Sequence, residues 1–178
     1  EPQGRPASVS LESLEEVGDF HFSSDGFGTA MEYYEQALVR LESYDAPDAI
    51  ATARLHRKIA DCYRSRGFLQ KSAAHLDLAF ENLVGLESEV EFGVSLTRRA
   101  DVRILRGQPE RALKDALMAI EALRSSAAHS EFAYAQTVAA ICYGRLGQPD
   151  QYEQLNLDAL ATYRRIEDPG DMAKHPTV

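Results

Sequence analysis

The sequence predicts an all-α fold, an α-α superhelix or solenoid of four helical hairpins in tandem. Three observations predict it. Glycines recur 40 residues apart at Gly67, Gly107 and Gly147, small residues keep fixed distances from them, and apolar residues recur every three or four positions. No segment carries the signals of a β-strand, so helices are expected throughout.

Small residues occupy the same two places in each repeat. They lie seven residues before and twelve residues after each glycine, at Ala60, Ala100, Ala140, Ala79, Ala119 and Ala159. In the first repeat the corresponding residues, 42 positions before Ala60, Ser72 and Ala79, are Gly18, Ala30 and Ala37. Small side chains let helix axes approach to about 8–10 Å. These residues therefore predict the seam between the two helices of each hairpin.

Glycine and proline punctuate the predicted turns. Each of the three repeated glycines stands where a first helix must end, and glycine adopts the left-handed cap conformation without steric cost. Pro109 and Pro149 follow two residues after their glycines, where a helix can start without an N–H group. The first turn differs, with Asp25-Gly26-Phe27-Gly28 in place of a single glycine.

Eight helices are expected from this pattern. They are placed at 10–24, 28–44, 47–66, 68–86, 89–106, 109–126, 130–146 and 149–167. Ser10, Ser88 and Ser130 are the expected starts, and Asp45-Ala46-Pro47 and Asp168-Pro169-Gly170 are the expected stops. One domain is expected over 9–168, with repeats at 10–44, 47–86, 89–126 and 130–167, after a disordered lead, 1–8, and before a tail, 169–178.

A known repeat family shares this layout. A small residue followed three positions later by an aromatic residue appears as Ala60-Tyr63 and Ala140-Tyr143, and the Gly-x-x-x-x-Ala pattern appears as GQPERA, ending at Ala112. With these residues, four in-register copies from 10 to 167 resemble the tetratricopeptide repeat (TPR) family. The resemblance implies stacked helical hairpins whose first helices line a concave groove that binds a protein or peptide.

The repeats are longer than the family standard of about 34 residues. At 40–42 residues they resemble, by length and layout, the sensor regions of bacterial activators related to the maltose regulator, peptide-pheromone regulators and kinesin light chains. That resemblance does not choose among the three.

Composition and charge exclude several kinds of function. The net charge is −9, whereas nucleic acids and anionic membranes attract basic surfaces. No apolar stretch is long enough to span a bilayer, and the first residues lack a signal-peptide pattern. A cytoplasmic protein is expected, with no nucleic acid bound by this segment and no membrane partner.

The expected groove stripe follows from the first helices. Its members are Glu12, Glu15, Asp19, Phe22, Arg54, Arg57, Asp61, Arg64, Val94, Thr97, Asp101, Ile104, Tyr134, Thr137 and Ile141. Ten of them are the candidate partner-binding residues: Glu15, Asp19, Arg54, Arg57, Asp61, Arg64, Thr97, Asp101, Tyr134 and Thr137. The stripe is charged at its start and apolar at its end.

Two interpretations of this stripe stay open. The three aspartates in the same place, Asp19, Asp61 and Asp101, either contact a partner or are solvated and paired with arginines such as Arg57 and Arg98. The apolar end either binds a partner or is covered by a further helix. A peptide with basic residues toward the first repeats and apolar residues toward Tyr134 would complement the stripe.

Family members that grip the carboxyl terminus of chaperone peptides use lysine, arginine and asparagine side chains in this stripe. Here three of the five places hold Glu15, Asp19 and Val94, and only Lys58 and Arg98 are basic. The departure argues against chaperone docking.

No catalytic or metal-binding pattern stands out. Cys62 and Cys142 lie two repeats apart, too far for a disulfide, and are expected as buried free thiols. The five histidines, His21, His56, His75, His129 and His175, lack metal-ligand spacing, and His21 and His56 are expected in the core. No nucleophile elbow, phosphate-binding loop or zinc signature occurs. Neither an enzyme nor a cofactor is expected.

The sequence thus predicts a protein- or peptide-binding scaffold, the interaction or sensory module of a larger regulatory protein in signal transduction or transcription control. Arginine is far commoner than lysine, which hints at a bacterial source. The alternative is a structural arm that forms a homo-oligomer through its exposed repeat ends.

Overall fold

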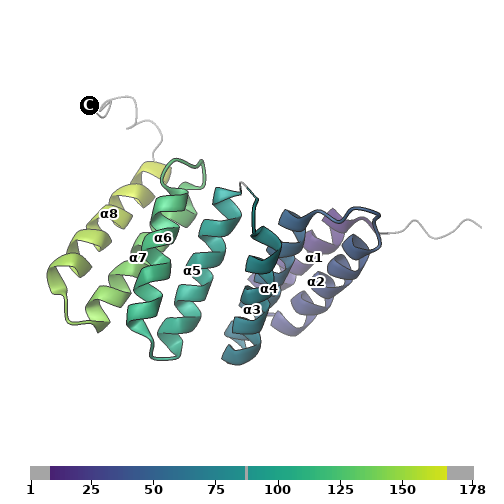
Figure 1. Ribbon diagram of the computed structural model, residues 1–178, viewed down its shortest axis with the longest axis horizontal. Coiled ribbons are helices and arrows are strands. Elements are labelled where there is room, and N and C mark those ends of the chain that lie inside the picture. Colours follow the sequence, from purple (N-terminus) through teal and green to yellow (C-terminus); the bar gives the residue numbers. More distant parts are fainter. Residues whose placement is uncertain (1–8, 87, 168–178) are drawn as a thin grey trace, which may run out of the picture. The chain divides into compact units, whose positions relative to one another are not determined.

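The computed structural model describes residues 9–86 and 88–167, and all regular secondary structure in this part of the chain is α-helical (Figure 1). The helices are α1 (Leu11–Ser23), α2 (Phe27–Glu42), α3 (Ala49–Ser65), α4 (Leu69–Leu83), α5 (Glu89–Leu105), α6 (Pro109–Leu123), α7 (His129–Arg145) and α8 (Pro149–Glu167). Each expected helix is present, and the four hairpins are α1–α2, α3–α4, α5–α6 and α7–α8.

The chain divides into two compact units, unit 1 (Glu1–Val84) and unit 2 (Gly85–Val178). In unit 1, α2 packs against both α1 and α3, and α3 packs against α4. In unit 2, α6 packs against α5 and α7, α7 packs against α8, and α5 also contacts α7. The same arrangement of two successive hairpins therefore recurs in each unit.

The repeated small residues are buried, as the seam requires. The eight seam alanines and Gly18 all lie in the interior. The close packing is tightest at two glycines. A Cβ atom on Gly18 would lie 2.4 Å from Cε1 of Tyr34, and one on Gly93 would lie 2.6 Å from Cγ of Leu123. Only glycine lets these helix pairs approach so closely.

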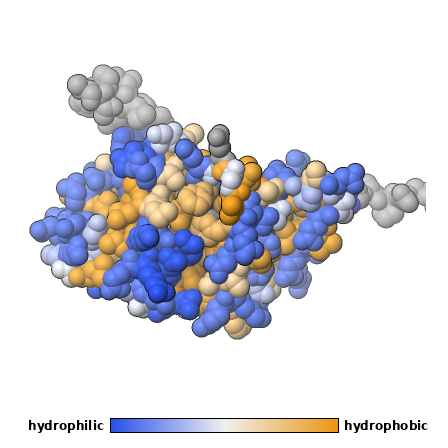
Figure 2. Space-filling view, in the orientation of Figure 1, coloured by the Kyte–Doolittle hydropathy of each residue, from blue (hydrophilic) through white to orange (hydrophobic). Residues whose placement is uncertain are grey.

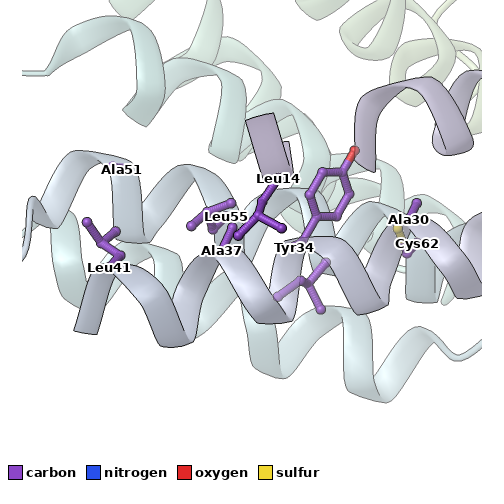
Figure 3. Packing of buried hydrophobic residues seen from close by; sticks show 9 residues of the cluster. Leu14, Ala30, Tyr34, Ala37, Leu41, Ala51, Leu55 and Cys62 are labelled. Atoms are coloured by element: carbon purple, nitrogen blue, oxygen red, sulfur yellow. The ribbon is translucent and has the colours of Figure 1, made fainter. Parts of the chain in front are cut away.

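The core of unit 1 forms around α2. It gathers residues from α1, α2 and α3: Leu14, Ala30, Tyr34, Ala37, Leu41, Ala51, Leu55, Ile59 and Cys62. Figure 3 shows their side chains converging, with the hydroxyl group of Tyr34 at the outer edge of the cluster. Because α2 contributes residues to the cluster along most of its length, this one helix links the first hairpin to the second.

The glycine turns form as predicted. Gly67, Gly107 and Gly147 all have positive φ, between 70° and 80°, and each is the second residue after the end of the first helix of a hairpin. In the first hairpin, where that glycine is missing, Asp25 takes the left-handed conformation with φ 59°. Pro109 and Pro149 are the first residues of α6 and α8. The punctuation of the sequence thus defines three of the four hairpin turns.

Most helix boundaries differ from the prediction by one to three residues, and α4 and α6 each end three residues early, at Leu83 and Leu123. α4 ends at Leu83 rather than at residue 86, because Gly85 adopts a positive φ of 77° and cannot continue the helix. α7 begins at His129, and the expected cap Ser130 lies inside the helix. The hydroxyl group of Ser126 instead accepts a hydrogen bond from the N–H group of Ala128. The expected stop at 168–170 lies outside the described residues.

Ser10 caps α1 as expected, since its side chain accepts a hydrogen bond from the N–H group of Ser13. Asp48 caps α3 in the same way, accepting from Ile50 and Ala51. Ser88 precedes α5 but makes no side-chain cap bond. The Asp45-Ala46-Pro47 segment lies in the connection between α2 and α3, as predicted.

Candidate binding surface

The first helices of unit 1 are joined by side chains that reach from α3 to α1. Nε of Arg54 lies 2.8 Å from Oε1 of Glu15, and a second bond from its NH2 group to Oε2 is 3.2 Å long. Nζ of Lys58 lies 2.7 Å from Glu15 and 2.7 Å from Asp19. We call these four residues the α1–α3 charge cluster. Among the candidate residues, Glu15 thus meets Arg54, whereas Asp19 meets Lys58, which is not one of the ten candidates.

Asp19 is the most exposed member of the cluster, and its carboxylate is nevertheless firmly held. Its Oδ1 accepts a 2.7 Å hydrogen bond from the hydroxyl group of Tyr34, and Lys58 donates to both carboxylate oxygens. About half of the Asp19 side chain, 52%, nevertheless remains accessible to solvent. A carboxylate held in this way keeps lone pairs free for a further donor.

Glu15 is more deeply placed than Asp19. Burial acts to raise the pKa of Glu15, but hydrogen bonds and positive charge from Lys58 and Arg54 outweigh it and hold the pKa below its usual value. Burial and the bond to Asp19 raise the pKa of Tyr34 well above that of an ordinary phenol. Tyr34 therefore stays a proton donor to Asp19 at every physiological pH.

The remaining predicted residues of α3 form a second group around Asp61, which is buried. One carboxylate oxygen lies 3.8 Å from NH1 of Arg57 and the other 3.6 Å from Nε of Arg64. Both arginines come from the same helix. The pairing of Asp61 with Arg57 is the one that the sequence suggested.

In unit 2 a comparable group joins α5 to α7. The hydroxyl group of Tyr134 donates a 2.8 Å hydrogen bond to Oδ2 of Asp101. The guanidinium group of Arg98 lies 4.9 Å from the centre of the Tyr134 ring and 3.5 Å from Glu131. Tyr134 therefore presents a ring that stacks with a cation and a hydroxyl group that is already bonded, not a free apolar surface.

Thr97 and Thr137 contribute differently. Thr97 is buried and Thr137 is half-buried, and each hydroxyl group donates to the carbonyl oxygen four residues earlier, that of Gly93 or Ala133. Such bonds satisfy the hydroxyl groups within their own helices.

Sequence reasoning missed two groups of residues. Tyr34 fixes Asp19, but nothing in the stripe pattern pointed to a residue of a second helix. Asp115 of α6 is almost fully buried, and its carboxylate pairs with Arg99 at 2.9 Å and with Arg103. The feature of the sequence that could have revealed Asp115 is its position among the seam alanines of α6, between Ala112 and Ala119.

Sites that could support chemistry are few in the described residues. No group of three or more histidine, cysteine, aspartate or glutamate side chains could hold a metal ion within 9–86 and 88–167. Cys62 and Cys142 are free and buried, and burial raises their pKa values to about 12 and 11. His56 is half-buried and not in the core, and its Nδ1 lies 3.2 Å from Nδ1 of His75. Across the described helices, none has both the length and the apolar character needed to cross a membrane.

Unit 2 also has a pocket of about 560 Å³ that the sequence did not predict. It lies between the α6–α7 turn, the first turn of α7 and the end of α8. Its lining comprises Arg124, Ala127, Ala128, His129, Ser130, Glu131, Phe132, Thr162, Arg165 and Ile166. Glu131 is the member that also contacts the Arg98–Tyr134 group.

Comparison with solved structures identifies the arrangement. Aspartyl phosphate phosphatase F from Bacillus subtilis matches with a TM-score of 0.78 and 16% identity over 89% of this chain. The apo form of RapI matches with a TM-score of 0.72 and 19% identity over 90% of this chain. A putative kinesin light chain with TPR-like repeats from Podosopora anserina matches with a TM-score of 0.70 and 17% identity over 93% of this chain. The fold is a TPR-like helical solenoid.

At these identities the likeness concerns the fold. The chain spans 41% of the phosphatase and 58% of RapI, and 78% of the kinesin light chain. No family model and no curated protein matches the sequence. The TPR-like repeats of this chain are thus recognised from its backbone, and its function must be argued from its own residues.

Proposed function

We propose that this chain is a protein- or peptide-binding scaffold, the interaction or sensory module of a larger bacterial regulatory protein. The TPR-like fold supports the proposal because stacked helical hairpins of this kind generally present an extended surface suited to a partner chain. Signal transduction or transcription control is the context that we propose for it.

The observation that carries the proposal is the state of Asp19. Its carboxylate is fixed by Tyr34 and Lys58, yet half of its side chain is open to solvent. A group that is both positioned and accessible loses little conformational entropy on binding, which is the usual property of a recognition residue. The buried Asp61 has no comparable access.

The chemistry of Asp19 suggests the chemistry of its partner. A carboxylate accepts strong charge-assisted hydrogen bonds from arginine, lysine or an amino terminus. Glu12 and Glu16 on the same helix are exposed and add negative charge nearby. We therefore propose a peptide segment with a basic residue as the ligand of unit 1.

Selection from a display library of random peptides against the immobilised chain tests the proposal. Enriched peptides should share arginine or lysine, and their recovery should fall when the chain carries Asp19→Asn. Asp77→Asn is the matched control, because Asp77 is an exposed aspartate on α4. Failure to enrich any sequence, or enrichment that is equal on both variants, would reject this assignment.

A second candidate function is homo-oligomerisation through an exposed repeat end. Leu160 of α8 is 44% exposed, whereas Ile120, its counterpart 40 residues earlier in α6, is 8% exposed. Light scattering over a range of concentrations separates the two functions. A strict monomer excludes this one, and a dimer that ignores every displayed peptide argues against the first.

A further inference from the structure

The outward face of α1 repeats, position by position, a face that is used for packing elsewhere in the same unit. α3 packs on α2 through Ala51, Leu55, Ile59 and Cys62, which are between 0% and 4% exposed. Moving 42 residues back along the sequence gives Val9, Ser13, Val17 and Phe20 of the α1 region. This set, which we call the α1 face, therefore has the register of a helix–helix interface.

Three of the four members of the α1 face are apolar, and all four are exposed. Val9 is 58% exposed, Val17 37% and Phe20 67%. The corresponding face of α7, at Ala135, Ala139 and Cys142, is fully buried. Two other first helices in the described chain thus bury this face, and α1 exposes a phenylalanine there. Burying Phe20 and both valines would remove a large apolar area from water.

Charge distinguishes the α1 face from its counterpart on α3. At the edge of the α3 face, Arg54 and Lys58 reach the acidic Glu15 and Asp19 of the preceding first helix. The residues 42 positions earlier, at the same edge of the α1 face, are Glu12 and Glu16, and both are exposed. A hairpin packed on α1 in this geometry would have to present basic residues where α1 itself presents acidic ones.

We propose that the α1 face docks a helical hairpin of a partner protein, one that offers small and apolar residues to Phe20 and lysine or arginine to Glu12 and Glu16. A second copy of this chain fits poorly. Two α1 faces would bring acidic residues together, and α7 carries Thr137 and Ile141 in the places where Glu15 and Asp19 stand in α1. The hairpin that complements the α1 face is therefore one with basic residues at these two places.

The test presents a hairpin of known register to the α1 face. A second copy of residues 7–48 is placed directly before residue 7, which supplies the hairpin at high effective concentration. In the basic tandem the added copy carries Glu15→Lys and Asp19→Lys, and in the acidic tandem it is unchanged. Phe20→Ser in the original α1 then reports docking, because a covered Phe20 contributes far more to stability than an exposed one.

Phe20→Ser should leave the melting temperature of the unextended chain unchanged and should lower that of the basic tandem by roughly 5–10 °C. The acidic tandem should show a clearly smaller loss. In the acidic tandem, Glu12→Lys and Glu16→Lys in the original α1 recreate the pairing of basic α3 residues with acidic α1 residues. In that variant Phe20→Ser should again lower the melting temperature by the full amount. This reciprocal variant keeps the test valid if the lysine-bearing copy itself folds poorly.

Equal losses in the basic and acidic tandems would overturn the charge requirement, and no loss in any tandem would overturn docking. Sedimentation of the unextended chain tests whether a second copy of this chain occupies the α1 face. A dimer that Phe20→Ser disrupts would identify that copy as the partner and reject the proposal. Peptide binding at Asp19 is a separate measurement, and Phe20→Ser should leave it unchanged.

Discussion

Gly18 of α1 lies directly against the ring of Tyr34 of α2, so that a Cβ atom at residue 18 would approach Cε1 to 2.4 Å. The ring cannot swing away freely, because its hydroxyl group is bonded to Asp19. This contact sets how closely the first hairpin packs, and it also positions the carboxylate of the proposed binding surface.

Gly18→Ala should therefore lower the free energy of unfolding by about 1–3 kcal/mol through overpacking. Gly28→Ala is the control. Gly28 also lies in a helix, but a Cβ atom there would meet nothing within 4 Å, and alanine should be neutral or slightly stabilising. Urea unfolding of both variants measures the difference. Equal stabilities would mean that the first seam is looser than described.

Gly107→Ala should cost about 1–2 kcal/mol, the price of placing an L-residue in the left-handed region. Its φ is 70°, and the space around it is empty, so backbone strain is the sole cause expected. Gly107→Asn should cost less, because asparagine tolerates this conformation better. An alanine variant as stable as the original protein would contradict the cap assignment.

Asp115→Asn should destabilise unit 2 by about 2–4 kcal/mol, because the nearly buried carboxylate compensates both Arg99 and Arg103. Glu121→Gln provides the comparison, since Glu121 also pairs with an arginine, Arg124, but on the exposed surface. That pair should contribute nothing measurable. Chemical unfolding distinguishes the two, and similar losses would be inconsistent with a buried ion pair in the α5–α6 hairpin.

Stability should decrease as the pH falls below about 6.5. Burial lowers the pKa of His56, and burial together with the charge of His56 lowers that of His75. The unfolded chain therefore takes up protons first, and unfolding becomes easier until the pH reaches the lowered pKa values. Replacing His75 with glutamine should reduce the loss in unfolding free energy between pH 7.5 and 5.5. An unchanged pH dependence in the His75 variant would contradict this explanation.

Much of the fold was predictable because its determinants are local. A glycine at 67, 107 or 147 ends a helix through its own backbone freedom, and Pro109 starts one through its fixed φ. The prediction that Ser130 starts a helix was wrong because it also relied on a local signal. A serine near a helix start resembles a cap, but α7 begins at His129 without a side-chain cap, and Ser130 lies inside the helix.

The binding surface was less predictable because it depends on which long side chains meet. Helical register placed Glu15, Asp19 and Arg54 near one another, but it could not show that Lys58 bridges both carboxylates or that Tyr34 comes from α2 to fix Asp19. The same limit applied to Tyr134. Its position suggested an apolar site, whereas Asp101 bonds its hydroxyl group and Arg98 stacks on its ring.

The most direct measurement is the affinity of one selected basic peptide for three forms of the chain, by fluorescence polarisation. Asp19→Asn should weaken binding about 5- to 30-fold, equivalent to one charge-assisted hydrogen bond of about 1–2 kcal/mol. The fold should persist, because Lys58 keeps Glu15 as its partner. Asp77→Asn should bind like the original chain. Unchanged affinity of the Asp19 variant would contradict the account.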